Sequence, residues 1–191
     1  MDLGISGRKA IVCASSRGLG KACAISLARN GVHVTLNGRD ESVLATTAQE
    51  IRNLAPDIDV ITVAGNVSDP QCQQALLDAT PGADILINNN GGPPFRDFRE
   101  LDRKAITEGV IMNMITPIEM INSVIDSMAD DVVRALRNNG LRVHHREGTG
   151  AGGWVLLDFP GIVVHFFSRS AREFYGLEQL WARAPEIVRV Q

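Results

Sequence analysis

In the first half of this 191-residue chain, short apolar runs alternate with amphipathic segments, and this alternation constrains the fold most. It predicts strands at residues 9–14, 33–38, 59–65 and 83–89, and helices near residues 18–30, 40–54 and 70–79. Short connections between alternating strands and helices favour parallel strands joined by right-handed crossovers. We therefore predict a three-layer, Rossmann-like α/β fold with strand order 3-2-1-4 and a crevice at the carboxyl end of the first strand.

A glycine-rich turn follows the first predicted strand. The segment CASSRGLG, residues 13–20, leads directly into the predicted helix KACAISLARNG. Gly18 and Gly20 permit a tight turn, and the amides and positive dipole end of the helix suit a pyrophosphate. Glycines also serve such turns through packing alone, so a purely structural role stays open.

The end of the second predicted strand bears on the choice of dinucleotide. An acidic residue near this point commonly binds a free ribose 2′-hydroxyl. Here the sequence reads Asn37-Gly38-Arg39, and the first acid is Asp40. Arg39, assisted by Arg17 or Ser16, could bind a 2′-phosphate through charge-assisted hydrogen bonds. The pattern favours NADP(H), with a solvated arginine as the alternative.

Four motifs occur in order: VCASSRGLG, LNGRD, GNVSD at residues 65–69 and ILINNNGG at residues 85–92. Over about residues 5–128 they resemble the short-chain dehydrogenase/reductase family, and most of all its NADP-dependent 3-oxoacyl-reductase-like members. The resemblance also marks a departure, because Ala14 stands where the family motif has its first glycine. It implies a cofactor site made of Ser16, Arg17, Gly18, Leu19, Gly20, Arg39, Asn66, Val67, Asn89 and Gly91.

The same resemblance implies a catalytic tetrad, of which this sequence matches only the asparagine, at Asn113. The family uses a Tyr-x-x-x-Lys pair in which the tyrosine protonates a carbonyl oxygen and the lysine lowers its pKa. The one tyrosine, Tyr175, is followed four residues later by Gln179, and the only lysines are Lys9, Lys21 and Lys104. We therefore expect no catalytic turnover, with residual NADP-dependent reduction through another acid as an alternative.

The last third of the chain has a different pattern. It predicts a helix to about residue 138, a strand at 141–148, a hairpin of strands 153–158 and 162–167, and a closing helix with apolar residues at helical spacing, Phe174, Leu177, Leu180 and Trp181. The three histidines His144, His145 and His165 predict no metal site, because adjacent residues on a strand point to opposite faces.

The segments ADDVVRALRNNGLRVHHREG, GGWVLLDFPGIVVHFF and AREFYGLEQLWARAP resemble the ribosomal silencing factor (Iojap-like) family over about residues 129–187. This resemblance implies binding to a protein of the large ribosomal subunit, with Trp154 in the contact surface. A packing role within the hairpin is the alternative for Trp154. We assign Tyr175, Leu177 and Trp181 to the core rather than to the contact.

The two resemblances meet inside one helix, near residues 128–131, which divides the chain into residues 1–128 and 129–191. We expect strand 141–148 to lie parallel to strand 83–89, and the hairpin to extend that sheet antiparallel, completing one continuous domain. Pro117 predicts a break or kink in a helix running from Arg103 to Asn138. We interpret the combination as an engineered chimera of two α/β fragments.

Composition predicts where the protein is located and argues against nucleic acid and membranes as partners. The net charge of −3 argues against direct nucleic-acid binding. No apolar run reaches the roughly 18 to 20 residues that span a bilayer, so we expect no membrane contact. The three cysteines form no C-x-x-C pair, which favours reduced thiols and a cytoplasmic protein.

Overall fold

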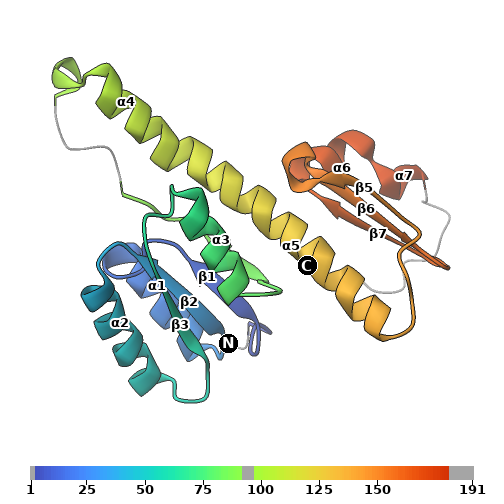
Figure 1. Ribbon diagram of the computed structural model, residues 1–191, viewed down its shortest axis with the longest axis horizontal. Coiled ribbons are helices and arrows are strands. Elements are labelled where there is room, and N and C mark those ends of the chain that lie inside the picture. Colours follow the sequence, from blue (N-terminus) through green and yellow to red (C-terminus); the bar gives the residue numbers. More distant parts are fainter. Residues whose placement is uncertain (1–2, 92–96, 181–191) are drawn as a thin grey trace.

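The computed structural model describes residues 3–91 and 97–180, whose arrangement is shown in Figure 1. Gly92 of the last dehydrogenase-like motif and Trp181 of the predicted closing helix lie outside the described residues. The strands are β1 (Lys9–Val12), β2 (His33–Gly38), β3 (Val60–Ala64), β4 (Ile85–Ile87), β5 (His145–Thr149), β6 (Trp154–Phe159) and β7 (Ile162–Phe167). The α-helices are α1 (Gly18–Arg29), α2 (Glu41–Leu54), α3 (Pro70–Ala79), α4 (Arg103–Val110), α5 (Thr116–Asn138), α6 (Arg169–Tyr175) and α7 (Leu177–Leu180).

The first four strands form the predicted parallel sheet. Their order is β3-β2-β1-β4 and each pairing is parallel, which confirms the α/β fold and the strand order 3-2-1-4. Successive residues of β1 serve opposite faces: Val12 packs in one buried cluster with Leu44 of α2. Ile11 packs in a second cluster with Leu76 of α3 and Met120 of α5. Helices on both faces explain why these strands read as continuous apolar runs.

The C-terminal strands do not extend that sheet, so this part of the expected architecture is wrong. Strands β5, β6 and β7 form a separate antiparallel sheet, and β5 pairs with β6 rather than with β4. The strand predicted at 141–148 begins only at His145, while Leu141 and Val143 pack against the core of the second sheet. The short connection after α5 leads to the face of that helix opposite the parallel sheet, where the local hairpin supplies ladder partners.

Helices α4 and α5 form one long rod that passes both sheets (Figure 1). A π-helical turn, Ile111–Ile115, joins them directly before Thr116 and Pro117. This irregularity is the form taken by the predicted break, since a proline removes a backbone donor from the helical ladder. Among the described residues, no helix is long and apolar enough to cross a lipid bilayer.

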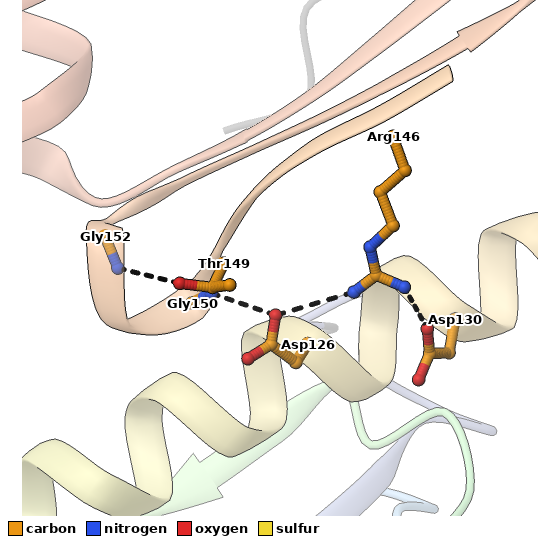
Figure 2. Close-up of polar contacts among 6 residues, drawn as sticks. All are labelled: Asp126, Asp130, Arg146, Thr149, Gly150 and Gly152. Atoms are coloured by element: carbon orange, nitrogen blue, oxygen red, sulfur yellow. Dashed lines mark hydrogen bonds and ion pairs between the residues drawn. The ribbon is translucent and has the colours of Figure 1, made fainter. Parts of the chain in front are cut away.

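The second sheet is seated on α5 through apolar and polar contacts. Val155, Leu157 and Phe159 of β6 are buried with Ala129 of α5. At the edge of the sheet, Arg146 forms ion pairs with two aspartates of α5, Asp126 and Asp130 (Figure 2). The Asp126 carboxylate also accepts a hydrogen bond of 2.9 Å from the Gly150 amide. The antiparallel sheet therefore contacts one side of α5 through both its buried face and its edge strand β5.

In the turn before β6, Gly150 packs directly against the backbone of α5. An added Cβ at Gly150 would sit 2.2 Å from the Asn122 carbonyl oxygen, whereas at Gly152 it would meet only Thr149 Oγ1, at 3.8 Å. We predict that Gly150→Ala lowers the free energy of unfolding by about 1–3 kcal/mol, because the turn must move off the helix. Gly152→Ala, the matched control in the same turn, should change it by less than about 0.5 kcal/mol. Urea unfolding followed by circular dichroism measures both, and equal losses would contradict this seating.

Candidate functional site

Buried polar contacts fix the carboxyl ends of β1, β2 and β3 to one another. Asn37, only 1% exposed, donates from its amide to the carbonyl oxygens of Val63 (3.1 Å) and Gly65 (3.2 Å). Its Oδ1 accepts from the Ala14 amide at 3.3 Å, and the Ser15 hydroxyl accepts from the Asn37 amide at 3.0 Å. The sequence analysis missed this role, although an asparagine within an apolar run is the signal that could have revealed it.

The glycine turn has the geometry of an anion site at a helix start. Helix α1 begins at Gly18, whose φ is +57°, and the preceding Arg17 provides no side-chain cap for the first amides. An added Cβ at Gly20 would lie 2.4 Å from the Ala14 carbonyl oxygen and 2.8 Å from Asn89 Nδ2. Gly20 is therefore also required by packing alone, which was the alternative role for the glycines of this turn. The amides at the start of α1 remain the part of the turn suited to phosphate.

Ala14 occupies a strained position in the same turn. Its φ is +45°, and it is the only non-glycine residue with positive φ in the described part of the chain. The left-handed region costs an L-residue about 1–2 kcal/mol, whereas glycine enters it without that penalty. The departure noted in the motif thus has a direct conformational consequence, while the Ala14 carbonyl still accepts from Asn89 Nδ2 at 3.2 Å.

At the end of β2, Arg39 and Arg17 lie near Asp40, whose carboxylate already accepts hydrogen bonds at the start of α2. Asp40 caps α2 by accepting from the amides of Ser42 and Val43. The Ser42 hydroxyl, the Val43 amide and then the charge of Arg17 lower the pKa of Asp40. An added Cβ at Gly38 would lie 3.0 Å from Ser16, so the turn after β1 and the end of β2 adjoin. Arg17 and Arg39 are both exposed at this side of the crevice.

The other predicted residues line or flank the opposite wall. A cavity of about 240 Å³ is lined by Cys13, Val67, Asn88, Asn89, Asn90, Met112, Asn113, Thr116 and Pro117. Val67, Asn89 and Asn113 are thus brought to one place. Asn66 instead accepts from the Ser68 amide, and the Gly91 amide donates to Asn90 Oδ1, so these two flank the cavity. Leu19 is 79% exposed beside the helix start.

Within residues 3–91 and 97–180, no tyrosine–lysine pair of the expected kind lies beside Asn113. Burial raises the pKa of the Cys13 thiol to about 12, so that group stays neutral at physiological pH. Lys21 is paired with Glu50 at 2.6 Å, and the Lys9 ammonium donates to the Pro81 carbonyl oxygen. Tyr175 belongs to α6 in the C-terminal part. The cavity therefore offers amides, a hydroxyl and a neutral thiol.

A second candidate surface lies on the side of the antiparallel sheet opposite α5. We define the aromatic surface as Trp154, His165, Phe167 and Tyr175. The Trp154 ring lies 5.5 Å from Phe167 and 4.7 Å from Tyr175 between centroids, and its Nε1 donates to His165 Nδ1 at 3.1 Å. Burial lowers the pKa of His165, which keeps the imidazole neutral and able to accept this bond.

The expected core position of Tyr175 is wrong, because Tyr175 is 44% exposed at the surface of α6, beside Phe174, which is 83% exposed. Both belong to α6. The backbone amide of Ser168, the N-cap of this helix, donates to the Gly153 carbonyl oxygen just before β6. Trp154 stacks on partners and still reaches the surface. Packing and contact roles therefore coexist at this residue.

The parallel sheet with a glycine turn at its crevice defines a Rossmann-like fold of the dehydrogenase type, joined to a second α/β unit. The short chain dehydrogenase family model matches residues 8–135, and the model named ribosomal silencing factor during starvation matches residues 122–191. The chain belongs to the short chain dehydrogenase family over its first two thirds and to the ribosomal silencing factor family over its last third. The predicted junction at residues 128–131 lies inside the overlap of the two matches.

Individual relatives agree with this division. The uncharacterized oxidoreductase YvaG of Bacillus subtilis is 35% identical over 48% of this chain and 34% of its own length. The ribosomal silencing factor RsfS of Chromobacterium violaceum is 31% identical over 45% of this chain and 70% of its own length. The crystal structure of L-sorbose reductase from Gluconobacter frateurii, complexed with NADPH and L-sorbose, superposes with a TM-score of 0.64 and 27% identity. It covers 69% of this chain, and the chain covers 51% of that reductase.

The chain spans a third to a half of the dehydrogenase relatives that it matches. It covers more of the silencing factors, including 90% of the length of RsfS from Haemophilus influenzae at 29% identity.

We predict that Ala14→Gly raises the free energy of unfolding by about 0.5–1 kcal/mol. Relief of the positive φ should outweigh the added flexibility of the unfolded chain. Ala10→Gly, in the preceding strand β1 and fully buried, is the matched control and should lower stability instead. Chemical unfolding of the three proteins measures the differences. A loss in Ala14→Gly as large as that in Ala10→Gly would rule out strain at this turn.

Proposed function

We propose that this chain binds NADP(H) in the crevice beside β1 and does not turn it over. The observation that carries the proposal is the glycine turn at the start of α1, where uncapped amides adjoin two exposed arginines, Arg17 before the helix and Arg39 after β2. In this reading the pyrophosphate lies at the amides of the helix start. The residues of the site are Ser16, Arg17, Gly18, Leu19, Gly20, Arg39, Asn66, Val67, Asn89 and Gly91.

Selectivity for the 2′-phosphate follows from charge at the end of β2. Asp40 is held as the cap of α2 and its low pKa keeps it ionised, so it is a poor partner for a phosphate but neutralises part of the field of Arg17. Among the described residues, Arg39 forms no ion pair or side-chain hydrogen bond, and its guanidinium can form a bidentate pair with a phosphate. We therefore assign the main contact with the 2′-phosphate to Arg39.

Absence of turnover follows from the sequence. The family's tyrosine supplies a proton, and a positioned acid contributes about 10²–10⁴-fold to the rate. No Tyr-x-x-x-Lys occurs in the chain, and the neutral Cys13 thiol with its pKa of about 12 is a weak substitute. Residual NADP-dependent reduction is the rival, and NADPH oxidation with small ketones distinguishes the two. The pairing of a partial dehydrogenase with a silencing factor supports our interpretation of an engineered chimera.

We predict that NADP⁺ raises the midpoint of thermal unfolding more than NAD⁺ does. Ligand at 100 times its dissociation constant adds about 2.7 kcal/mol to stability. Arg39→Gln should weaken NADP⁺ binding by about tenfold or more, because one charge-assisted contact contributes about 1.5–3 kcal/mol, and should leave NAD⁺ binding unchanged. Titration calorimetry measures the affinities.

Arg29→Gln is the matched control, since Arg29 is exposed at the opposite end of α1. It should bind NADP⁺ like the parent chain. Equal weakening by both substitutions, or equal affinity of the parent for the two dinucleotides, would remove Arg39 from the site.

A second function is favoured by the aromatic surface: docking on a protein of the large ribosomal subunit, in the cytoplasm. Trp154 is held by a hydrogen bond to His165 and by three ring contacts, so little side-chain entropy is lost when a partner covers it. The family of the last third is named for ribosomal silencing. A ring fixed in this way is suited to be a binding anchor.

We predict that Trp154→Ala reduces co-sedimentation with large ribosomal subunits by about thirtyfold in affinity, the scale of a binding hot spot of 2 kcal/mol. Trp154→Phe should retain most of the binding, because it keeps a ring in the stack. Ile162→Ala changes an exposed residue at the far end of the hairpin and serves as the control. Circular dichroism confirms that each variant is folded. Equal pelleting of all four proteins would eliminate this docking surface.

A further inference from the structure

Thr47 is the polar member of the buried face of α2. The other buried residues of this helix, Leu44, Ala48 and Ile51, are apolar and pack in the cluster on one face of the parallel sheet. Thr47 is 2% exposed, and its hydroxyl donates a hydrogen bond of 2.9 Å to the carbonyl oxygen of Ser16. A buried hydroxyl costs free energy unless it is bonded, so this bond makes a threonine acceptable at the position.

The neighbouring Thr46 shows what a threonine of this helix does without such a partner. Its hydroxyl donates at 2.9 Å to the carbonyl oxygen of Ser42, four residues earlier in the same helix, and the residue is exposed. Such a bond to the preceding turn is a common arrangement for a threonine within a helix. Thr47 instead bonds a residue 31 positions away, in the turn between β1 and α1. Its hydroxyl therefore ties α2 to that turn.

This bond fixes the part of the turn that immediately precedes Arg17. Ser15 is already held at the end of β2, because its amide donates to the Asn37 carbonyl oxygen at 2.7 Å and its hydroxyl accepts from the Asn37 amide at 3.0 Å. The next carbonyl, that of Ser16, is held by α2. Arg17 then leads into α1 with an extended backbone, at φ −152° and ψ 171°. The direction in which the chain leaves the turn at Arg17 therefore depends on the carbonyl bond to α2.

The same contact holds one arginine of the proposed site relative to the other. Arg39 follows Gly38, and an added Cβ at Gly38 would lie 3.0 Å from Ser16. Arg17 and Arg39 are both exposed, and each loses rotamer freedom when it binds a phosphate. Two such side chains bind one phosphate well only when the backbone beneath them is held in place by supporting hydrogen bonds. Thr47, itself buried, supplies one of these.

The amides proposed for the pyrophosphate are anchored from a different direction. The turn at Ala14 is bonded to the loop after β4, since Asn89 Nδ2 donates to the Ala14 carbonyl oxygen at 3.2 Å. Gly20 packs against the same carbonyl. Loss of the Thr47 hydroxyl should therefore loosen the side of the turn that faces the 2′-phosphate more than the helix start. NAD⁺, which lacks that phosphate, should be much less sensitive to the loss than NADP⁺.

We propose that Thr47 is a positioning residue that acts through Arg17 and sets the preference of this chain for NADP(H) over NAD(H). The inference rests on the proposed function, because it needs a dinucleotide in the crevice beside β1. A hydroxyl that only satisfies its own burial would affect folding alone. A positioning hydroxyl also affects the ratio of the two affinities.

Titration calorimetry of NADP⁺ and NAD⁺ with three variants tests this role. Thr47→Val removes the hydroxyl with little change of shape and should lower the ratio of NADP⁺ to NAD⁺ affinity about fivefold, the scale of one lost hydrogen bond. Thr47→Ser keeps a hydroxyl and should restore most of the ratio. Thr46→Val, the matched control, removes a hydroxyl bonded within α2 and should leave the ratio unchanged. Thermal unfolding of each variant measures the cost to folding separately.

A double-substitution cycle tests whether the effect passes through Arg17. In an Arg17→Gln background, Thr47→Val should change the ratio by less than about twofold, because residues that act as one unit do not contribute additively. An unchanged ratio in Thr47→Val, or an equally large effect in the Arg17→Gln background, would overturn the positioning role alone. A parent chain that does not prefer NADP⁺ would overturn the proposed function, and the role of Thr47 with it.

Discussion

The packing of α5 between two sheets is the interaction on which the rest of this structure depends. Met120 is buried against the parallel sheet and α3, and Ala129, nine residues later, is buried against the antiparallel sheet. Neither sheet keeps a closed core without this helix. The overlap of the two family matches, residues 122–135, covers the part of α5 where its buried contacts pass from one sheet to the other. The region where the two family matches overlap is therefore also the part of α5 that connects the two sheets.

The parallel half could be predicted because its signals are local. Apolar runs, short connections and the glycine turn fix both the strand order and the crevice before any long-range contact is known. The hairpin of β6 and β7 was predictable for the same reason. The relation between the two sheets was not, because the strand His145–Thr149 is exposed at every residue and carries no pattern that selects a partner. Its pairing is decided by where α5 directs the chain.

Part of the candidate site could likewise be predicted from the sequence, and part could not. The glycines and arginines have recognisable types and spacing, and the departure at Ala14 was visible in the sequence, although only the backbone shows the φ of +45°. Asn37 was missed because its importance lies in four contacts with three other segments, and none of them is local. A buried amide in an apolar strand costs free energy unless it is fully bonded. Its presence therefore indicates that the crevice needs its strand ends held in register.

The π-helical turn forms part of the wall of the crevice. Met112 and Asn113 of that turn line the cavity beside Asn89 and Asn90, while Met114 of the same turn is 59% exposed. The Asn90 amide donates to the Met112 carbonyl oxygen at 3.2 Å, so the loop after β4 is bonded to the turn itself. Because α4 buries none of its residues, its attachment to the rest of the chain depends on this turn.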